Sequence, residues 1–180
     1  MKYIERPIVL ESKNIMKFRC SVFVFIGLLI ISSIANAQSD FSGSWILNST
    51  EHVSGPEYAN ALAKQVNIQQ RDSLFVETIS VGTEGKDIIN AHTLSMSGTS
   101  VTYINPTSKR KIVRSLTWSE DKTKLTITSV YSMPENENKI DLTRIEIWQL
   151  SKDGMQLNID KKSIEAKGDS WEVRGIFIKQ

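Results

Sequence analysis

Apolar and polar residues alternate along most of the chain from Gly43 onward, with turn-forming residues every 8 to 12 positions or so. A period of two places successive side chains on opposite faces of a strand, and short strands with regular turns are typical of an antiparallel barrel or sandwich. The pattern therefore predicts ten strands. Their expected ranges are 42–47, 65–71, 74–81, 88–96, 100–104, 110–118, 124–132, 139–150, 155–164 and 171–179.

The segment KLTITSVY, from Lys124 to Tyr131, shows the alternation most clearly. One face would carry Leu125, Ile127, Ser129 and Tyr131, and the other Thr126, Thr128 and Val130. Its Thr, Ile and Val content suits a pleated sheet. Because no Pro- or Ser-rich linker interrupts the pattern, we expect a single all-β domain over 38–180. The predicted fold is an antiparallel up-and-down barrel of about 8–10 strands.

One short helix is expected after the first strand. Ser54, Gly55, Pro56 and Glu57 supply an N-cap, a first-turn proline and an early acidic residue. Apolar residues four apart then form a narrow stripe, Tyr58 with Leu62 and Ala59 with Ala63. Such a helix would either plug one end of the barrel or act as a lid over a ligand.

A faint repeat indicates two similar hairpins. SEDKTKLTI, from Ser119, and SKDGMQLNI, from Ser151, share the pattern S-x-D-x-x-x-L-x-I, and each follows a strand that ends near a tryptophan, Trp118 or Trp148. Ser and Asp side chains bond to neighbouring backbone groups in turns, and Gly154 can adopt a positive φ.

The first 37 residues are predicted to be a targeting segment. Basic residues precede the apolar run Val22–Ala35, and Ala35-Asn36-Ala37 has the small residues that signal peptidase requires. Cleavage is expected after Ala37, giving a periplasmic or secreted protein. Met16 is an alternative start that leaves a signal of ordinary length. The run is short for a membrane span, which takes about 20 apolar residues, so no stable span is expected after cleavage.

Removal of that segment changes the composition. Cys20, the sole cysteine, would leave with it, so the barrel would be held by its core without a disulfide. Five of the 22 basic and two of the 20 acidic residues also lie in the first 37, so the formal charge changes from +2 for the whole chain to −1 for 38–180. A nearly neutral domain gives no electrostatic reason to bind nucleic acid.

Gly43-Ser44-Trp45 opens the first strand. A glycine allows close backbone approach where this strand crosses one barrel end, and the indole can close the floor. A cation stacked on that ring would add about 0.5–2 kcal/mol, and Arg174 in the last strand is the expected cation.

These features resemble the lipocalin and wider calycin pattern, and more closely a group of secreted lipocalin-like proteins of Bacteroidetes. Four motifs in order carry the resemblance over residues 41–179: G-x-W-x-L-N at 43–48, K-x-x-x-I at 64–68, W-S-x-D-x-x-x-L at 118–125, and W-x-L-S-x-D-G-x-x-L at 148–157. The resemblance implies a barrel with Gly43, Trp45 and Arg174 as its structural signature. It also implies binding of a small apolar or amphipathic ligand in that barrel, although the group has no agreed activity.

The densest basic run, Lys109–Arg114, gives a first candidate site. Arg110 and Arg114 fall on one face with Ile112. This face is either a solvated edge that discourages sheet pairing or an anion-binding rim or lumen, for example for a fatty-acid carboxylate.

A second charged face places Arg144 and Glu146 with Leu142 and Trp148. In the lumen they would be a charged pair beside a ligand, whereas outside they would be a surface pair worth about 0–1 kcal/mol. Arg114, Arg144 and Trp148 are the candidate ligand-binding residues.

No motif specifies a reaction, a cofactor or a metal site. The two histidines, His52 and His92, lack a neighbouring ligand set, and no G-x-S-x-G elbow is present. The first hypothesis is therefore a ligand-binding barrel. The alternative is a protein-interaction or inhibitor module with a filled barrel, and an enzyme is a third.

Overall fold

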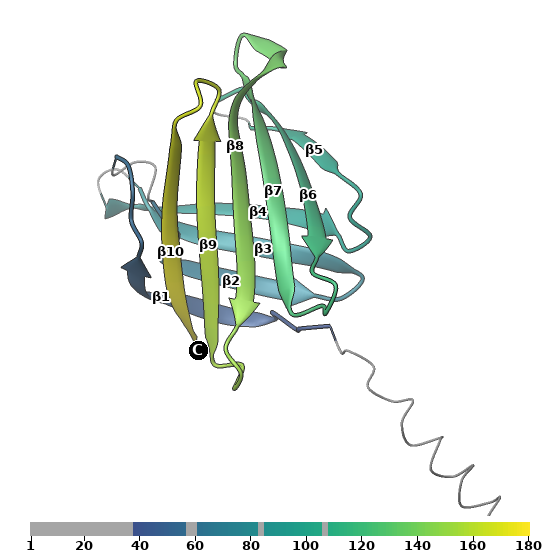
Figure 1. Cartoon of the computed structure of the whole chain (residues 1–180), viewed down its shortest axis with the longest axis vertical. Coiled ribbons are helices and arrows are strands. Elements are labelled where there is room, and N and C mark those ends of the chain that lie inside the picture. Colours follow the sequence, from purple (N-terminus) through teal and green to yellow (C-terminus); the bar gives the residue numbers. More distant parts are fainter. Residues whose placement is uncertain (1–37, 57–60, 83–84, 106–107) are drawn as a thin grey trace, which may run out of the picture. The chain divides into compact units, whose positions relative to one another are not determined.

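The computed structural model describes residues 38–56, 61–82, 85–105 and 108–180, and this part of the chain is all β. Within it, no helix is long and apolar enough to span a membrane. The strands (Figure 1) are β1 (Gly43–Glu51), β2 (Gln65–Gln70), β3 (Ser73–Val81), β4 (Asp87–Ser95), β5 (Val101–Ile104), β6 (Lys111–Trp118), β7 (Lys124–Met133), β8 (Asn136–Leu150), β9 (Gln156–Glu165) and β10 (Ser170–Lys179). All ten predicted strands are confirmed, with ends shifted by a few residues.

The strands form one antiparallel sheet in the order β4-β3-β2-β1-β10-β9-β8-β7-β6-β5. The chain is thus an up-and-down meander in which the first strand pairs with the last, as the predicted fold class requires. In Figure 1, β1 to β4 run behind and across β6 to β10, so the sheet curls into a barrel. The barrel is nearly closed: its seam lies between β4 and β5, the two ends of the sheet.

The helix expected between Ser54 and Ala63 is not seen in the described residues. Positions 57–60 lie outside them, and both the described residues before these, up to Pro56, and those after them, from Ala61, are non-helical. The backbone of Ser54 instead pairs with β10, donating its N–H to the Glu172 carbonyl at 2.8 Å and continuing the β1–β10 ladder. The Ser54 hydroxyl also accepts the Glu172 N–H at 2.8 Å, so the side-chain oxygen that would cap a helix is bonded to β10 instead.

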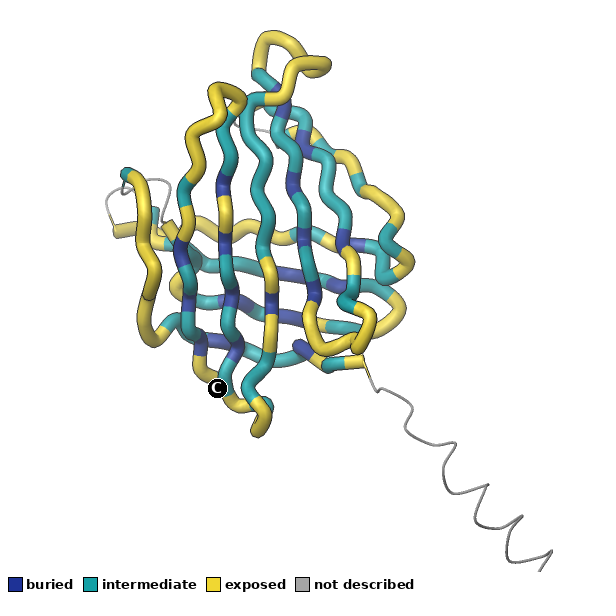
Figure 2. The backbone as a smooth tube through the Cα atoms, in the orientation of Figure 1, coloured by how far each residue is buried: buried dark blue, intermediate teal, exposed yellow. Residues whose placement is uncertain are grey.

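Buried residues recur at alternate positions along the strands (Figure 2) and form an apolar floor at one end of the barrel. Trp45 is fully buried in it, and its Nε1 donates to the Phe41 carbonyl at 2.9 Å. The Phe41 ring lies edge-on to Trp148, with centroids 6.1 Å apart. Gly43 has φ of +143°, a backbone conformation that other residues rarely adopt, which explains the glycine two residues before Trp45.

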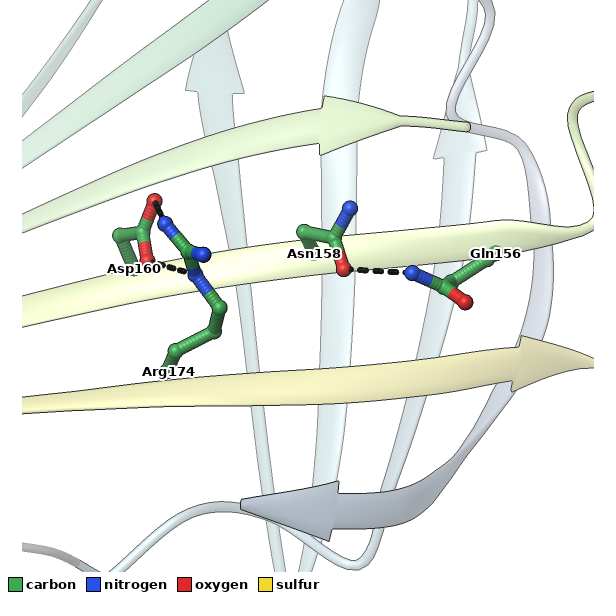
Figure 3. Close-up of polar contacts among 4 residues, drawn as sticks. All are labelled: Gln156, Asn158, Asp160 and Arg174. Atoms are coloured by element: carbon green, nitrogen blue, oxygen red, sulfur yellow. Dashed lines mark hydrogen bonds and ion pairs between the residues drawn. The ribbon is translucent and has the colours of Figure 1, made fainter. Parts of the chain in front are cut away.

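The predicted stacking of Arg174 on Trp45 is wrong, because Lys179 occupies that place with Nζ 5.2 Å from the ring centroid. Trp45 and Lys179 are direct partners in the β1–β10 register, whereas Arg174 lies at the opposite parity, five residues earlier. Arg174 faces outward and forms a two-bond ion pair with its own register partner, Asp160 (Figure 3).

The repeated S-x-D motifs form two turns with matching hydrogen bonds. Ser119 Oγ donates to Asp121 at 2.6 Å and accepts from Lys124 N at 2.9 Å, and Ser151 makes the same two bonds with Asp153 and Gln156 at the same lengths. The hydrogen bonds from Ser119 and Thr123 lower the pKa of Asp121 to about 2.

The two turns differ at one backbone position, which gives a stability prediction. Lys122 has φ of 58° where the second turn has Gly154 at 71°. A left-handed conformation costs a non-glycine residue about 1–2 kcal/mol, partly offset by the larger entropy that glycine loses on folding. Lys122→Gly is expected to raise the free energy of unfolding by about 0.5–1 kcal/mol in urea denaturation. Gly154→Ala, whose Cβ would contact nothing, should lower it; unchanged or lower stability for Lys122→Gly would contradict this account.

Candidate binding cavity

Above the apolar floor the barrel encloses a cavity of about 530 Å³. One wall, from β5 to β9, supplies Tyr103, Arg114, Tyr131, Arg144, Glu146 and Lys161. The opposite wall, from β2 to β4 and the segment at 61–63, is mostly aliphatic or neutral, with Leu62, Val66, Val76, Thr78, Ile89 and His92. The cavity therefore has a charged side and an apolar side.

The centre of the charged wall is a row of four side chains on adjacent strands. In the strand register, Arg114 on β6 pairs with Ser129 on β7, and Ser129 pairs with Arg144 on β8. Arg144 in turn pairs with Ser163 on β9. The alternation that points Leu125 and Ile127 inward also points Ser129 inward. The guanidinium Nε atoms donate to the serine hydroxyls, Arg114 to Ser129 at 3.1 Å and Arg144 to Ser163 at 3.4 Å. We call these residues the arginine row.

Each arginine of this row also lies over a tyrosine ring. Arg114 Cζ is 5.2 Å from the Tyr103 ring centroid, and Arg144 Cζ is 5.5 Å from that of Tyr131. Arg144 Nη1 is 3.4 Å from the Tyr131 hydroxyl. Burial raises the pKa of Tyr103, so this phenol remains protonated at neutral pH. The serines and tyrosines hold both guanidinium groups in position inside the cavity.

Positive charge exceeds negative charge on this wall. Among the described residues, no carboxylate lies within ion-pair distance of Arg114, Arg144 or Lys161. The face carrying Arg144 and Glu146 is the lumen, but the two side chains do not pair: Glu146 Oε2 accepts a hydrogen bond from Trp148 Nε1 at 3.2 Å. The arrangement favours an anion as occupant, because a buried cation is stabilised by an opposite charge.

Lys161 lies on the same wall, on the inward face of β9. Only 6% of its surface is exposed, and its Nζ donates to the Ala61 carbonyl at 2.6 Å. Burial, together with the nearby positive charge of Arg144, lowers the pKa of Lys161 to about 8, against an opposing effect of Glu146. At neutral pH most molecules therefore carry a third positive charge here.

His92 on β4 is the one titratable group of the opposite wall among the described lining residues. Burial and then the charge of Arg114 lower the pKa of His92 to about 3. Since an unfolded histidine titrates near 6.5, the unfolded chain binds a proton between these values that the folded chain does not. Stability should therefore fall as the pH falls below 6.5, by up to about 1.4 kcal/mol per pH unit.

Urea unfolding of the wild type at about pH 7.5 and pH 5.5 measures this loss. His92→Gln should flatten the dependence, whereas His52→Gln, at an exposed site, should retain the wild-type slope. An equal slope in wild type and His92→Gln would contradict burial of a neutral histidine.

The structure brings the three candidate ligand-binding residues together. Arg114, Arg144 and Trp148 all line the cavity, Trp148 at its floor and only 2% exposed. Their role in binding stays a prediction. Arg110 does not line the cavity and pairs with Asp141 at 2.5 Å.

Several lining residues were not predicted from the sequence, although one of them carried a signal. Lys161 falls on the same face of β9 as Leu157 and Ile159. A lysine on an otherwise apolar strand face was the signal for this residue. His92 lies next to a stretch of β4 with no alternation, where Asp87 to Ala91 are all exposed, and Tyr103 lies on β5, which has only four residues.

The fold and cavity together define the chain as a ten-stranded antiparallel barrel protein with a charged interior. No protein-family model matches the chain, and no curated protein matches it. Among solved structures, a zebrafish ileal bile acid-binding protein in complex with cholic acid is similar at 15% sequence identity, over 79% of this chain and 100% of that one, with a TM-score of 0.46. Within the residues that the structure describes, no three His, Cys, Asp or Glu side chains gather as a metal site would require.

Proposed function

We propose that the barrel binds one small amphipathic anion in its cavity. The observation that carries this proposal is the pair of guanidinium groups, Arg114 and Arg144, that face the cavity without a carboxylate partner among the described residues. The anionic head group would lie against the arginine row, and the apolar part against Val66, Val76 and Leu62 on the opposite wall.

The energetics of the site favour an anion over a neutral ligand. Arginine donates several hydrogen bonds in a planar fork that matches a carboxylate. Here a serine accepts from the Nε of each arginine, and the Tyr131 hydroxyl accepts from Arg144 Nη1. The other terminal nitrogens would donate to the ligand. A hydrogen bond to a charged group contributes about 1.5–3 kcal/mol. Because the serines and tyrosines already hold the guanidinium groups, little side-chain entropy is lost on binding.

Access to the cavity is expected at the seam of the barrel. Lining residues reach both edge strands of the sheet, with Ile89 and Ala91 on β4 and Tyr103 on β5. Ile88 and Ile89 are 50% and 62% exposed beside this seam, which supplies an apolar rim along which a hydrocarbon chain can enter.

Isothermal titration of the wild-type barrel with dodecanoate and with dodecanol tests this proposal. The two ligands share an alkyl chain and differ in the charge of the head group. We expect saturable binding of dodecanoate at one site per barrel, at least tenfold tighter than binding of dodecanol. Equal affinity for the two, or no binding of either, would contradict an anion site.

The alternative function was a protein-interaction module with a filled barrel. The cavity of about 530 Å³ speaks against that premise, because side chains do not fill this part of the interior. The ligand-binding hypothesis is therefore the one that the geometry supports.

We further propose that residues 1–37 are a signal removed after Ala37 and that the barrel is periplasmic or secreted. The basic residues, apolar run and Ala-Asn-Ala site support this, as does the start of β1 at Gly43, a few residues beyond. When the full chain is expressed in a bacterium, the mass of the exported protein should correspond to a start at Gln38; an uncleaved, unexported chain would contradict cleavage after Ala37.

Gly43, Trp45 and the later motifs likewise support a place in the lipocalin-like group of Bacteroidetes.

A further inference from the structure

The amine of Lys161 is unusual in being inside the barrel. Lysine is almost never fully buried unless it is paired with a carboxylate, and among the described residues Lys161 forms no ion pair. Its Nζ nevertheless lies at the cavity wall, held by the Ala61 carbonyl at 2.6 Å. This leaves a primary amine next to the space that the proposed ligand would occupy.

The groups around this amine are suited to carbonyl chemistry. Glu146 on β8 is the direct register partner of Lys161, and Arg144 lies diagonally next to it on the same strand. On the other side β10 presents the apolar Val173, also a register partner. His92 and Arg114 are the other charged or titratable groups of the described walls, besides the tyrosines.

We propose that Lys161 captures amphipathic aldehydes in the cavity as reversible imines. This inference rests on the proposed function, because the aldehyde would use the same cavity, with its alkyl chain on the apolar wall. It assigns to the barrel a second class of ligand, held by a covalent bond rather than by the arginine row.

The reaction balances without an oxidant or a reductant. The neutral Nζ attacks the aldehyde carbon, the carbon–nitrogen double bond forms, and the carbonyl oxygen leaves as water with the two amine protons. The Glu146 carboxylate, opposite Lys161, can take up and return a proton during loss of water, and it offsets the positive charge of a protonated imine.

The electrostatics of the site make the amine available. A pKa of about 8, set first by burial and next by Arg144, leaves an appreciable neutral fraction of Lys161 at neutral pH, whereas an ordinary lysine near 10.4 has very little. Capture at Lys161 should therefore accelerate as the pH rises toward 8.

The adjacent residue, Lys162, is a matched control. It faces the outside of β9, where its Nζ pairs with Glu172 at 2.6 Å, and its side chain is 45% exposed. The two lysines thus share a strand and a sequence neighbourhood and differ in which face they occupy.

Reductive trapping with dodecanal and borohydride at about pH 7.5, followed by intact mass and peptide mapping, tests the proposal. We expect one dodecyl group per barrel, mapped to Lys161 in the wild type, retained in Lys162→Met and lost in Lys161→Met and Lys161→Arg. An excess of dodecanoate should slow the labelling at least several-fold. Peptide mapping of the wild type alone is decisive if a variant fails to fold. Labelling spread over surface lysines with no excess at Lys161 would overturn the proposal.

The titration with dodecanoate separates this inference from the proposed function. If dodecanoate binds but Lys161 is not labelled, the imine proposal alone is wrong. If dodecanoate does not bind and Lys161 is not labelled, both are wrong.

Discussion

Replacing both cavity arginines, as Arg114→Gln with Arg144→Gln, is expected to weaken dodecanoate binding by about a hundred- to ten-thousandfold. Each substitution removes a charged donor next to the head group, worth about 1.5–3 kcal/mol, and every tenfold in affinity corresponds to about 1.4 kcal/mol. Each single variant should lose about ten- to a hundredfold. Calorimetric titration of the four proteins measures the effect.

The folded state of the empty barrel should survive these changes. Among the described residues the two arginines have no carboxylate partner, so their removal leaves no buried negative charge behind. Arg110→Gln is the matched control, since this arginine precedes the same strand but is paired with Asp141. It should keep wild-type affinity. Unchanged affinity in the double variant, or an equal loss in Arg110→Gln, would contradict the arginine row as the head-group site.

Trp45→Ala is expected to lower the free energy of unfolding by about 3–5 kcal/mol. Trp45 is fully buried in the floor of the barrel, so the substitution removes its packing and opens a cavity that the neighbouring strands cannot fill completely. It also leaves the Phe41 carbonyl without the indole donor and Lys179 without the ring on which it lies. Equilibrium unfolding in urea measures the loss.

Trp45→Phe separates packing from the polar contacts of the indole. It keeps an aromatic ring in the floor but loses the hydrogen bond to Phe41, and we expect a smaller cost of about 1–3 kcal/mol. A cost for Trp45→Ala no larger than that for Trp45→Phe would show that the floor does not depend on the size of this residue.

The fold was predictable because it follows from local signals. A period of two, interrupted by turn residues, marks each strand. The bonds predicted from Ser and Asp to neighbouring backbone groups are present in both the 119 and the 151 turn. The expected helix shows the limit of such signals. Ser54 can cap a helix or extend a ladder, and both its backbone N–H and its hydroxyl are bonded to Glu172, which is distant in sequence.

The candidate site was only partly predictable, since alternation says which residues share a face but not which face is inside. Arg144 and Glu146 were placed together correctly, yet only the register with Ile127 and Lys161 puts them in the lumen. Register also explains the wrong prediction of the cation on Trp45. The last strand carries both Arg174 and Lys179, and their odd spacing of five residues puts them on opposite faces, with Lys179 inward beside Trp45.

A crystal structure of the barrel with ω-bromododecanoate tests the central claim most directly, because the bromine marks the end of the alkyl chain independently of the carboxylate. The account predicts carboxylate oxygens within about 3 Å of the guanidinium nitrogens of Arg114 or Arg144, with the bromine against the apolar wall formed by β2 to β4. A ligand bound outside the barrel, or one inside with its bromine at the arginine row and its carboxylate at the seam, would contradict it.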